Sequence, residues 1–286
     1  MKHICLWCLT SLWVGPFALA QSGSEIILYD LAITSTNVVI SNPVNATQHP
    51  GYDNQPSFHP QKPFLYYTSF NTEGRAEIIE YHWKKKSTRS VTQTSEREYS
   101  PTVTPDGQFL SCIIQRDNGA QDLGKYPLAG GKPLVIINDL IVGYHAWVDG
   151  QTLLLFVLGE PQTLRWYDLT TQKDTILASH IGRSLHKIPG QNAMSFVHKS
   201  SSDRWIIKHL DIQSRKLSDL ADTLPGREDL CWLPDGRILS SDGSQLYWYD
   251  AAFKKWTPIK MPEAVNGITR LAVSSNGKKL AVVVAE

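Results

Sequence analysis

Six pairs of polar residues recur along this chain and include most of the side chains that could bind a ligand. The pairs start 45, 46, 39, 45 and 41 residues apart, at Asp53-Asn54, Glu98-Tyr99, Tyr144-His145, Arg183-Ser184, Glu228-Asp229 and Thr269-Arg270. Carboxylate, imidazole, phenol and guanidinium groups that converge on one point can bind a polar ligand or the charged end of a peptide. The side chains of Asn54, Glu98 and His145 could instead hold a divalent cation.

Common catalytic motifs are missing from the sequence. It contains no Gly-x-Ser-x-Gly turn, no His-Glu-x-x-His pair and no phosphate-binding loop. Residues 117–122 (DNGAQD) resemble a calcium loop, but the glycine comes too early and no glutamate closes the site. We interpret this segment as a hairpin turn and His186 as a core histidine. The sequence identifies no cofactor, and it favours a protein without catalysis while leaving an enzyme open.

Short β-strands joined by tight turns would position the polar pairs. The turns of the six repeats are Pro60-Gln61, Asp106-Gly107, Asp149-Gly150, Pro189-Gly190, Asp235-Gly236 and Asn276-Gly277. Asp-Gly and Asn-Gly supply the positive φ that two-residue hairpins require. Each repeat holds four β-rich segments, which in the second repeat are residues 101–103, 109–114, 123–128 and 133–137. Four strands in a repeat of about 40 to 45 residues are typical of one β-propeller blade.

The order of the segments predicts how the ring of blades closes. The chain begins with outer-strand patterns at residues 25–31 and 37–42, and it ends with inner-strand patterns within residues 268–286. The two ends therefore complete one shared sixth blade, which leaves no inner strand unpaired. We predict an all-β, six-bladed β-propeller of four-stranded blades, formed as a single domain by residues 21–286. The polar pairs then surround one mouth of the central channel, and we expect residues 41–55, the longest connection, to cover it.

Residues 1–20 have the pattern of a signal peptide. A short basic start precedes a largely apolar run, and Ala18-Leu-Ala20 fits the small-x-small cleavage rule. The run falls short of the roughly 20 residues that span a bilayer, and it contains Pro16. We therefore predict an exported protein, periplasmic or secreted, with no membrane span after cleavage.

Charge and cysteine content restrict the partners of residues 21–286. Removing Lys2 from the 28 basic residues leaves 27, which equals the number of acidic residues. A nucleic-acid partner usually requires a basic excess, so we expect none. Cys112 and Cys231 fall in the second and fifth blades, on opposite sides of the axis, and are too far apart for a disulfide. We predict two free thiols and a monomer.

Two repeats carry a resemblance to a known family. Residues 55–60 (QPSFHP) followed by 65–69 (LYYTS), and residues 100–107 (SPTVTPDG) followed by 109–113 (FLSCI), are similar to the repeat of TolB-like propellers. Residues 229–236 (DLCWLPDG) keep the turn but have lost the first proline, and the third, fourth and sixth repeats diverge further. The resemblance implies a six-bladed propeller in a family of periplasmic and secreted proteins. Because propellers support unrelated activities, it does not identify one.

Two functions from different classes follow as hypotheses. The favoured one is an exported, non-catalytic binding propeller that engages a protein or a cell-envelope ligand at the channel mouth. The predicted ligand-binding residues are Asp53, Asn54, Glu98, Tyr144, His145, Arg183, Glu228, Asp229 and Arg270. The alternative is a metal-assisted hydrolase or lyase with its site at the same mouth. A third interpretation has no ligand at all, because opposite charges at a hydrated channel mouth can simply neutralise each other.

Overall fold

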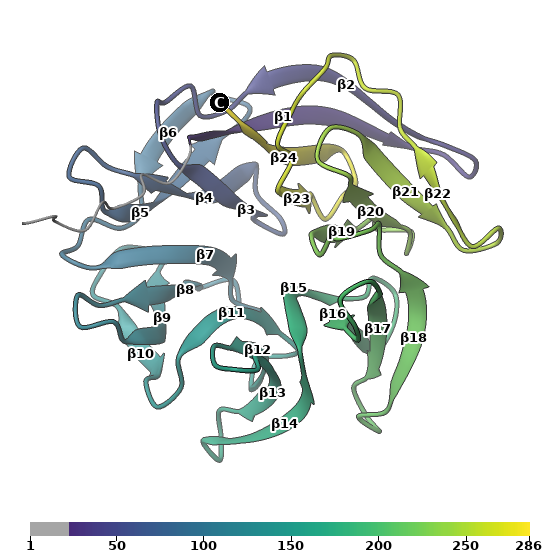
Figure 1. Ribbon diagram of the computed structural model, residues 1–286. Coiled ribbons are helices and arrows are strands. Elements are labelled where there is room, and N and C mark those ends of the chain that lie inside the picture. Colours follow the sequence, from purple (N-terminus) through teal and green to yellow (C-terminus); the bar gives the residue numbers. More distant parts are fainter. Residues whose placement is uncertain (1–22) are drawn as a thin grey trace, which may run out of the picture.

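The computed structural model describes residues 23–286, so the predicted signal peptide lies outside the described residues. The described chain forms six antiparallel sheets of four strands each, arranged like blades around a central axis (Figure 1). Within this range no helix is long and apolar enough to cross a membrane. The predicted all-β, six-bladed propeller is confirmed.

Five blades are formed by consecutive strands. The first three contain β3 (Asp53–Phe58), β4 (Phe64–Phe70), β5 (Ala76–His82) and β6 (Ser87–Ser90); β7 (Arg97–Val103), β8 (Phe109–Gln115), β9 (Gln121–Pro127) and β10 (Leu134–Ile137); and β11 (Val142–Trp147), β12 (Thr152–Val157), β13 (Thr163–Asp168) and β14 (Lys173–Ser179). The fourth and fifth contain β15 (Ile181–Lys187), β16 (Ala193–Lys199), β17 (Trp205–Asp211) and β18 (Leu217–Asp222); and β19 (Leu230–Trp232), β20 (Ile238–Ser241), β21 (Leu246–Asp250) and β22 (Lys255–Pro258). The first strand of each blade lies nearest the axis (Figure 1).

The sixth blade joins the two ends of the chain, as predicted. Its order from the axis outward is β23 (Arg270–Val273), β24 (Lys279–Ala285), β1 (Ser24–Ile33) and β2 (Val38–Asn45). β1 and β24 pair in register from Ser24 opposite Ala285 to Asp30 opposite Lys279. Because this pairing joins the two ends of the described chain within one sheet, the amino-terminal strands hold the carboxy-terminal ones in place.

The β-rich second strands form the centre of each blade. Leu153, Leu154 and Leu155 of β12 are fully buried, and so are residues 280–283 of β24. Side chains on both faces of these strands pack against the neighbouring blades, which explains why the sequence there is apolar without alternation. The packing fixes the positions at which the inner strands start.

The segment expected to be the longest connection is in fact short. β2 extends to Asn45 and β3 starts at Asp53, which leaves only residues 46–52 as a connection. This connection is bound to β1 because the Ala46 amide donates to the Ile26 carbonyl and the Ser24 amide donates to the Gly51 carbonyl, both at 2.8 Å. The connection between β22 and β23, residues 259–269, is longer. The prediction was wrong because the second strand of the terminal blade is longer than its sequence pattern suggested.

Two other predictions are confirmed. The calcium-like segment forms the hairpin between β8 and β9, where the Arg116 amide donates to the Ala120 carbonyl at 2.9 Å. Gly119 has a φ of 87°, which a glycine adopts without strain. Cys112 and Cys231 are both free and buried.

Candidate functional site

Two cavities lie along the axis of the propeller. The channel cavity has a volume of about 710 Å³ and is lined by all six inner strands. The mouth pocket has a volume of about 250 Å³ and is lined by Gly23, Ser24, Tyr52, Asn54, Tyr144, Arg183, Gly267, Thr269, Arg270 and Ala285. Tyr144, Arg183 and Arg270 line both cavities, so these three side chains separate the mouth pocket from the channel.

Four side chains from four consecutive blades form one network at this boundary, which we call the mouth network: Tyr144, Arg183, Asp229 and Arg270. The Arg183 guanidinium and the Asp229 carboxylate form a bidentate pair, in which Nε donates to Oδ1 at 3.1 Å and Nη2 donates to Oδ2 at 2.7 Å. Arg270 donates from Nη1 to Asp229 Oδ1 at 2.6 Å and from Nη2 to the Tyr144 hydroxyl at 2.9 Å. One carboxylate therefore bridges two guanidinium groups.

The ring of Tyr144 fixes the plane of the Arg270 guanidinium. The Arg270 Cζ atom lies 5.0 Å from the centre of the Tyr144 ring, within cation–π range. Tyr144 in turn packs edge-on against Phe156, with 5.6 Å between ring centres. The aromatic support restricts the rotamers of Arg270, so its polar atoms are held in position before a ligand arrives.

A second carboxylate supports Arg183 from behind. Glu228 Oε2 accepts from the Arg183 backbone amide at 3.0 Å and pairs with Lys199 Nζ at 3.2 Å. This close approach requires Gly182, because a Cβ atom there would lie 2.5 Å from Glu228 Oε2. Burial lowers the pKa of Arg183, but the bonds to Asp229 and the nearby Glu228 outweigh it and raise that pKa above its ordinary value. Arg183 therefore stays charged.

Strand irregularities decide which polar residues face the axis. The pairing of the first and second strands shifts register between Asn54 and Ser57 in one blade and between Tyr99 and Thr102 in the next. Gln55 and Ser100, which precede the first prolines of these strands, have φ values of 57° and 55°. Such bulges bend a strand and redirect its side chains.

Asp53 lies next to the mouth pocket but not in its lining. Its side chain is fully buried, and neither carboxylate oxygen has a hydrogen-bond partner in residues 23–286. The imidazole of His49 lies nearby, with its Nδ1 3.7 Å from Oδ2. Burial raises the pKa of Asp53 to about 6, although Ser69 and His49 lower it in part.

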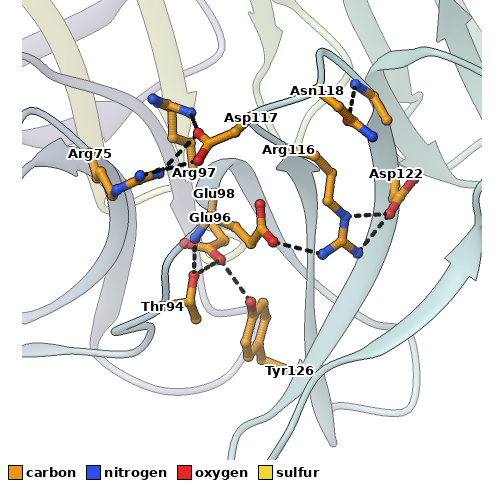
Figure 2. Close-up of polar contacts among 11 residues, drawn as sticks. Arg75, Thr94, Glu96, Arg97, Glu98, Arg116, Asp117, Asn118, Asp122 and Tyr126 are labelled. Carbon is orange, nitrogen blue, oxygen red and sulfur yellow. Dashed lines mark hydrogen bonds and ion pairs between the residues drawn. The ribbon is translucent and has the colours of Figure 1, made fainter.

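Glu98 points into the body of the propeller rather than into the mouth. Its Oε1 accepts from the Thr94 hydroxyl at 2.6 Å and from the Tyr126 hydroxyl at 2.8 Å (Figure 2). Glu98 is fully buried, which raises its pKa, and it lines neither cavity. The neighbouring Glu96 instead pairs with Arg116 at 3.0 Å (Figure 2). The prediction that Glu98 faces the mouth was wrong.

His145 lines the channel cavity and is bound to Ser111, with 2.7 Å between Nε2 and Oγ. The Ser111 hydroxyl donates its single hydrogen to the Thr102 carbonyl and also accepts from Trp147 Nε1. All three contacts of Ser111 are satisfied together when His145 donates to Oγ through a protonated Nε2. Burial lowers the pKa of His145 to about 4, so its imidazole is neutral at pH 7.

The three residues predicted as alternative metal ligands do not converge. Asn54 lines the mouth pocket, His145 binds Ser111 beside the channel, and Glu98 binds Tyr126 inside the second blade. Across residues 23–286, no group of three or more His, Cys, Asp and Glu side chains is arranged to hold a metal ion. Of the nine predicted ligand-binding residues, the structure brings together Tyr144, Arg183, Asp229 and Arg270, with Asn54 beside them and Glu228 behind Arg183.

Sequence reasoning missed several residues that line the cavities. Tyr52 lines the mouth pocket, and burial raises its pKa to about 12. It was missed because it precedes the expected start of its strand. Trp147 and Trp232 line the channel cavity and donate to Ser111 and Ser195 of the preceding blades at 2.9 and 2.8 Å. The sequence could have identified both, since each tryptophan lies on an inner strand shortly before a tight turn.

Comparison with known proteins places the fold in a wider group. No family model and no curated protein sequence matches the chain. Among solved structures it is similar to a putative TolB from Agrobacterium tumefaciens, with a TM-score of 0.72, 14% identity, and 93% of this chain and 99% of that one covered. TolB from Acinetobacter baumannii gives a TM-score of 0.57 and 15% identity over 92% of this chain and 64% of that one. An oligogalacturonate lyase in complex with manganese gives a TM-score of 0.59 and 12% identity over 94% of this chain and 99% of that one.

These similarities concern the fold. The chain has the fold of the TolB-like six-bladed propellers, as the resemblance of its repeats predicted. Because one of the similar structures is a lyase and the TolB names state no activity, the fold alone does not decide between binding and catalysis.

Proposed function

We propose that this protein is an exported, non-catalytic binding propeller that engages a protein or a cell-envelope ligand at the channel mouth. The mouth network carries this proposal, because it places polar side chains from four blades under an open pocket and supports them with further contacts. Such preorganisation is typical of a binding surface. The similarity to two TolB structures supports the same class of function.

The arrangement of Ser111 and His145 argues against nucleophilic catalysis. In a catalytic pair the serine hydroxyl donates to the histidine, and a third group orients the other ring nitrogen. Here the hydroxyl donates to the Thr102 carbonyl, and His145 Nδ1 is buried without a partner in residues 23–286. Ser111 is itself fully buried. These contacts support a structural role for the pair, which connects the second and third blades.

A metal-assisted hydrolase or lyase is the second candidate. One observation favours it, namely the shared fold with a lyase that binds manganese. The separation of Asn54, Glu98 and His145 weighs against it. Elemental analysis of the protein purified without chelator distinguishes the two candidates. A stoichiometric metal would support the enzyme. If the protein is incubated with excess manganese, the free ion is removed and no metal remains bound, the result would support the binding propeller.

Export and a monomeric state belong to the same proposal. Cleavage after Ala20 would give a chain that starts at Gln21, two residues before Gly23, and Gly23 lines the mouth pocket. Fractionation of the native cells, with amino-terminal sequencing of the recovered chain, tests the compartment and the cleavage site. Light scattering of the purified chain tests the monomer.

A site-specific crosslinking experiment tests the location of binding. A photoreactive residue at Thr269, which is exposed and lines the mouth pocket, should crosslink to the partner in the native cell. The matched control is Gln61, which is exposed in the β3–β4 turn on the opposite face of the propeller. Adducts that form from Gln61 and not from Thr269 would refute binding at the mouth.

A further inference from the structure

The mouth pocket has an excess of positive charge on its floor. Arg183 and Arg270 are both part of its lining, and no aspartate or glutamate is. The two guanidinium groups share one carboxylate, Asp229, while Glu228 is paired with Lys199 at 3.2 Å and also lies 3.7 Å from Arg183 Nε. Counting these five side chains leaves one positive charge that no protein carboxylate balances. A ligand with one negative charge would complete the network.

Several donors at this floor remain available to a ligand. Arg183 uses Nε and Nη2 for Asp229, and Arg270 uses Nη1 for Asp229 and Nη2 for Tyr144. A guanidinium group has five N–H donors, so each arginine keeps some that no group in residues 23–286 accepts. The side chains of Arg183 and Arg270 are 32% and 15% exposed, and these exposed parts border the cavities.

The walls of the pocket match a carboxylate in size and polarity. Asn54 and Thr269 add an amide and a hydroxyl to the lining of the pocket, whereas the Ser24 hydroxyl donates to the Asp53 carbonyl at 3.0 Å. A volume of about 250 Å³ admits one side chain or one chain end rather than a folded domain. Two arginines repel a metal cation, whereas planar guanidinium groups match the geometry of a carboxylate.

We propose that the mouth pocket recognises a carboxylate of a peptide partner through Arg183 and Arg270. The carboxylate comes either from an Asp or Glu side chain or from the carboxyl end of the partner. Tyr144 and Asp229 act as positioning residues, because they hold the two guanidinium groups toward the pocket. This inference rests on the proposed function, since it names the ligand chemistry of the same pocket.

Two isomeric probes distinguish the sources of the carboxylate. N-acetylglutamate α-amide has only a side-chain carboxylate, and N-acetylglutamine has only a terminal one. Each is titrated into the protein at constant ionic strength while the side-chain NMR signals of the arginines are recorded. One probe should shift the Nε signals of Arg183 and Arg270 in a saturable manner. Uncharged N-acetylglutamine α-amide should not shift them. Failure of both acids, or equal shifts from the uncharged amide, would overturn the proposal.

Matched variants localise the effect. Arg270→Gln should weaken binding of the effective probe about tenfold or more, because one charge-assisted hydrogen bond is lost. Arg237→Gln is the control, since Arg237 is also 15% exposed and paired with an aspartate, but lies at the β19–β20 turn on the opposite face. It should leave binding unchanged. If Arg270→Gln does not fold, the titration of the wild-type protein still tests the carboxylate site, because it follows the signals of individual arginines.

The outcomes separate this inference from the proposed function. If a partner crosslinks from Thr269 but neither acid shifts the arginine signals, the carboxylate inference fails and the binding propeller stands. If an acid binds but no adduct forms from Thr269, the proposed function fails. Inorganic phosphate is the remaining probe. If it displaces the bound acid at equal or lower concentration, the pocket is a general anion site and not a carboxylate site.

Discussion

Asp53 is the first residue of β3 and lies fully buried where the amino-terminal strands meet the first blade. Neither of its carboxylate oxygens has a hydrogen-bond partner in residues 23–286, and the imidazole of His49 lies 3.7 Å away. An ionised carboxylate in such a place destabilises the fold, because burial removes its hydration. We therefore expect Asp53→Asn, which keeps the shape and removes the charge, to stabilise the protein at neutral pH.

The size of the gain follows from the pKa. Burial raises the pKa of Asp53 from its ordinary value of 3.8 to about 6. The folded state therefore binds this proton more tightly than the unfolded state, and the contribution of Asp53 to stability falls as pH rises through this window. A shift of about two pKa units corresponds to roughly 3 kcal/mol at and above pH 7. Below about pH 4 both states are protonated, and the gain should vanish.

Urea unfolding followed by tryptophan fluorescence measures this difference at pH 4 and at pH 7.5. The control is Asp30→Asn, because a hydrogen bond from Lys279, together with one from Asn42, lowers the pKa of Asp30. Its loss should slightly destabilise the protein at pH 7.5, so the two variants have opposite signs. A gain from Asp53→Asn that is the same at both pH values would refute the ionisation argument. A loss at pH 7.5 would show that Asp53 is paired in solution.

Three further predictions concern closure, thiols and the channel wall. Deleting residues 279–286 should unfold the protein in circular dichroism. β24 contributes Leu280 and three buried valines, each worth about 2 kcal/mol, against a total stability of about 5–15 kcal/mol. A monomeric variant with unchanged melting would contradict the closure. In protein that starts at residue 21, alkylation in denaturant without reductant should label both Cys112 and Cys231, whereas a mass two hydrogens lighter would show a disulfide. Trp147→Phe should lower the free energy of unfolding by about 1 kcal/mol, since its bond to Ser111 at 2.9 Å is lost; a variant as stable as wild type would show that water replaces that bond.

The sequence by itself determined the architecture of this protein. The Asp-Gly and Asn-Gly turns mark the repeat, and the four β-rich segments in each repeat define a blade. The order of the patterns at the two ends required a shared sixth blade, and β1 pairs with β24 as expected. These features are local or periodic, so they can be read without knowing which side chains meet in space.

Only the tertiary structure decided which polar residues share the mouth. Successive side chains of a strand point in opposite directions, so neighbouring positions reach different environments. A bulge at the start of an inner strand reverses that assignment, and the sequence does not show where the pairing shifts. As a result Glu98 binds Tyr126 inside its blade, whereas Arg270 reaches across the axis to Tyr144. The mouth network depends on contacts between blades, and these are set by the closed ring rather than by any one repeat.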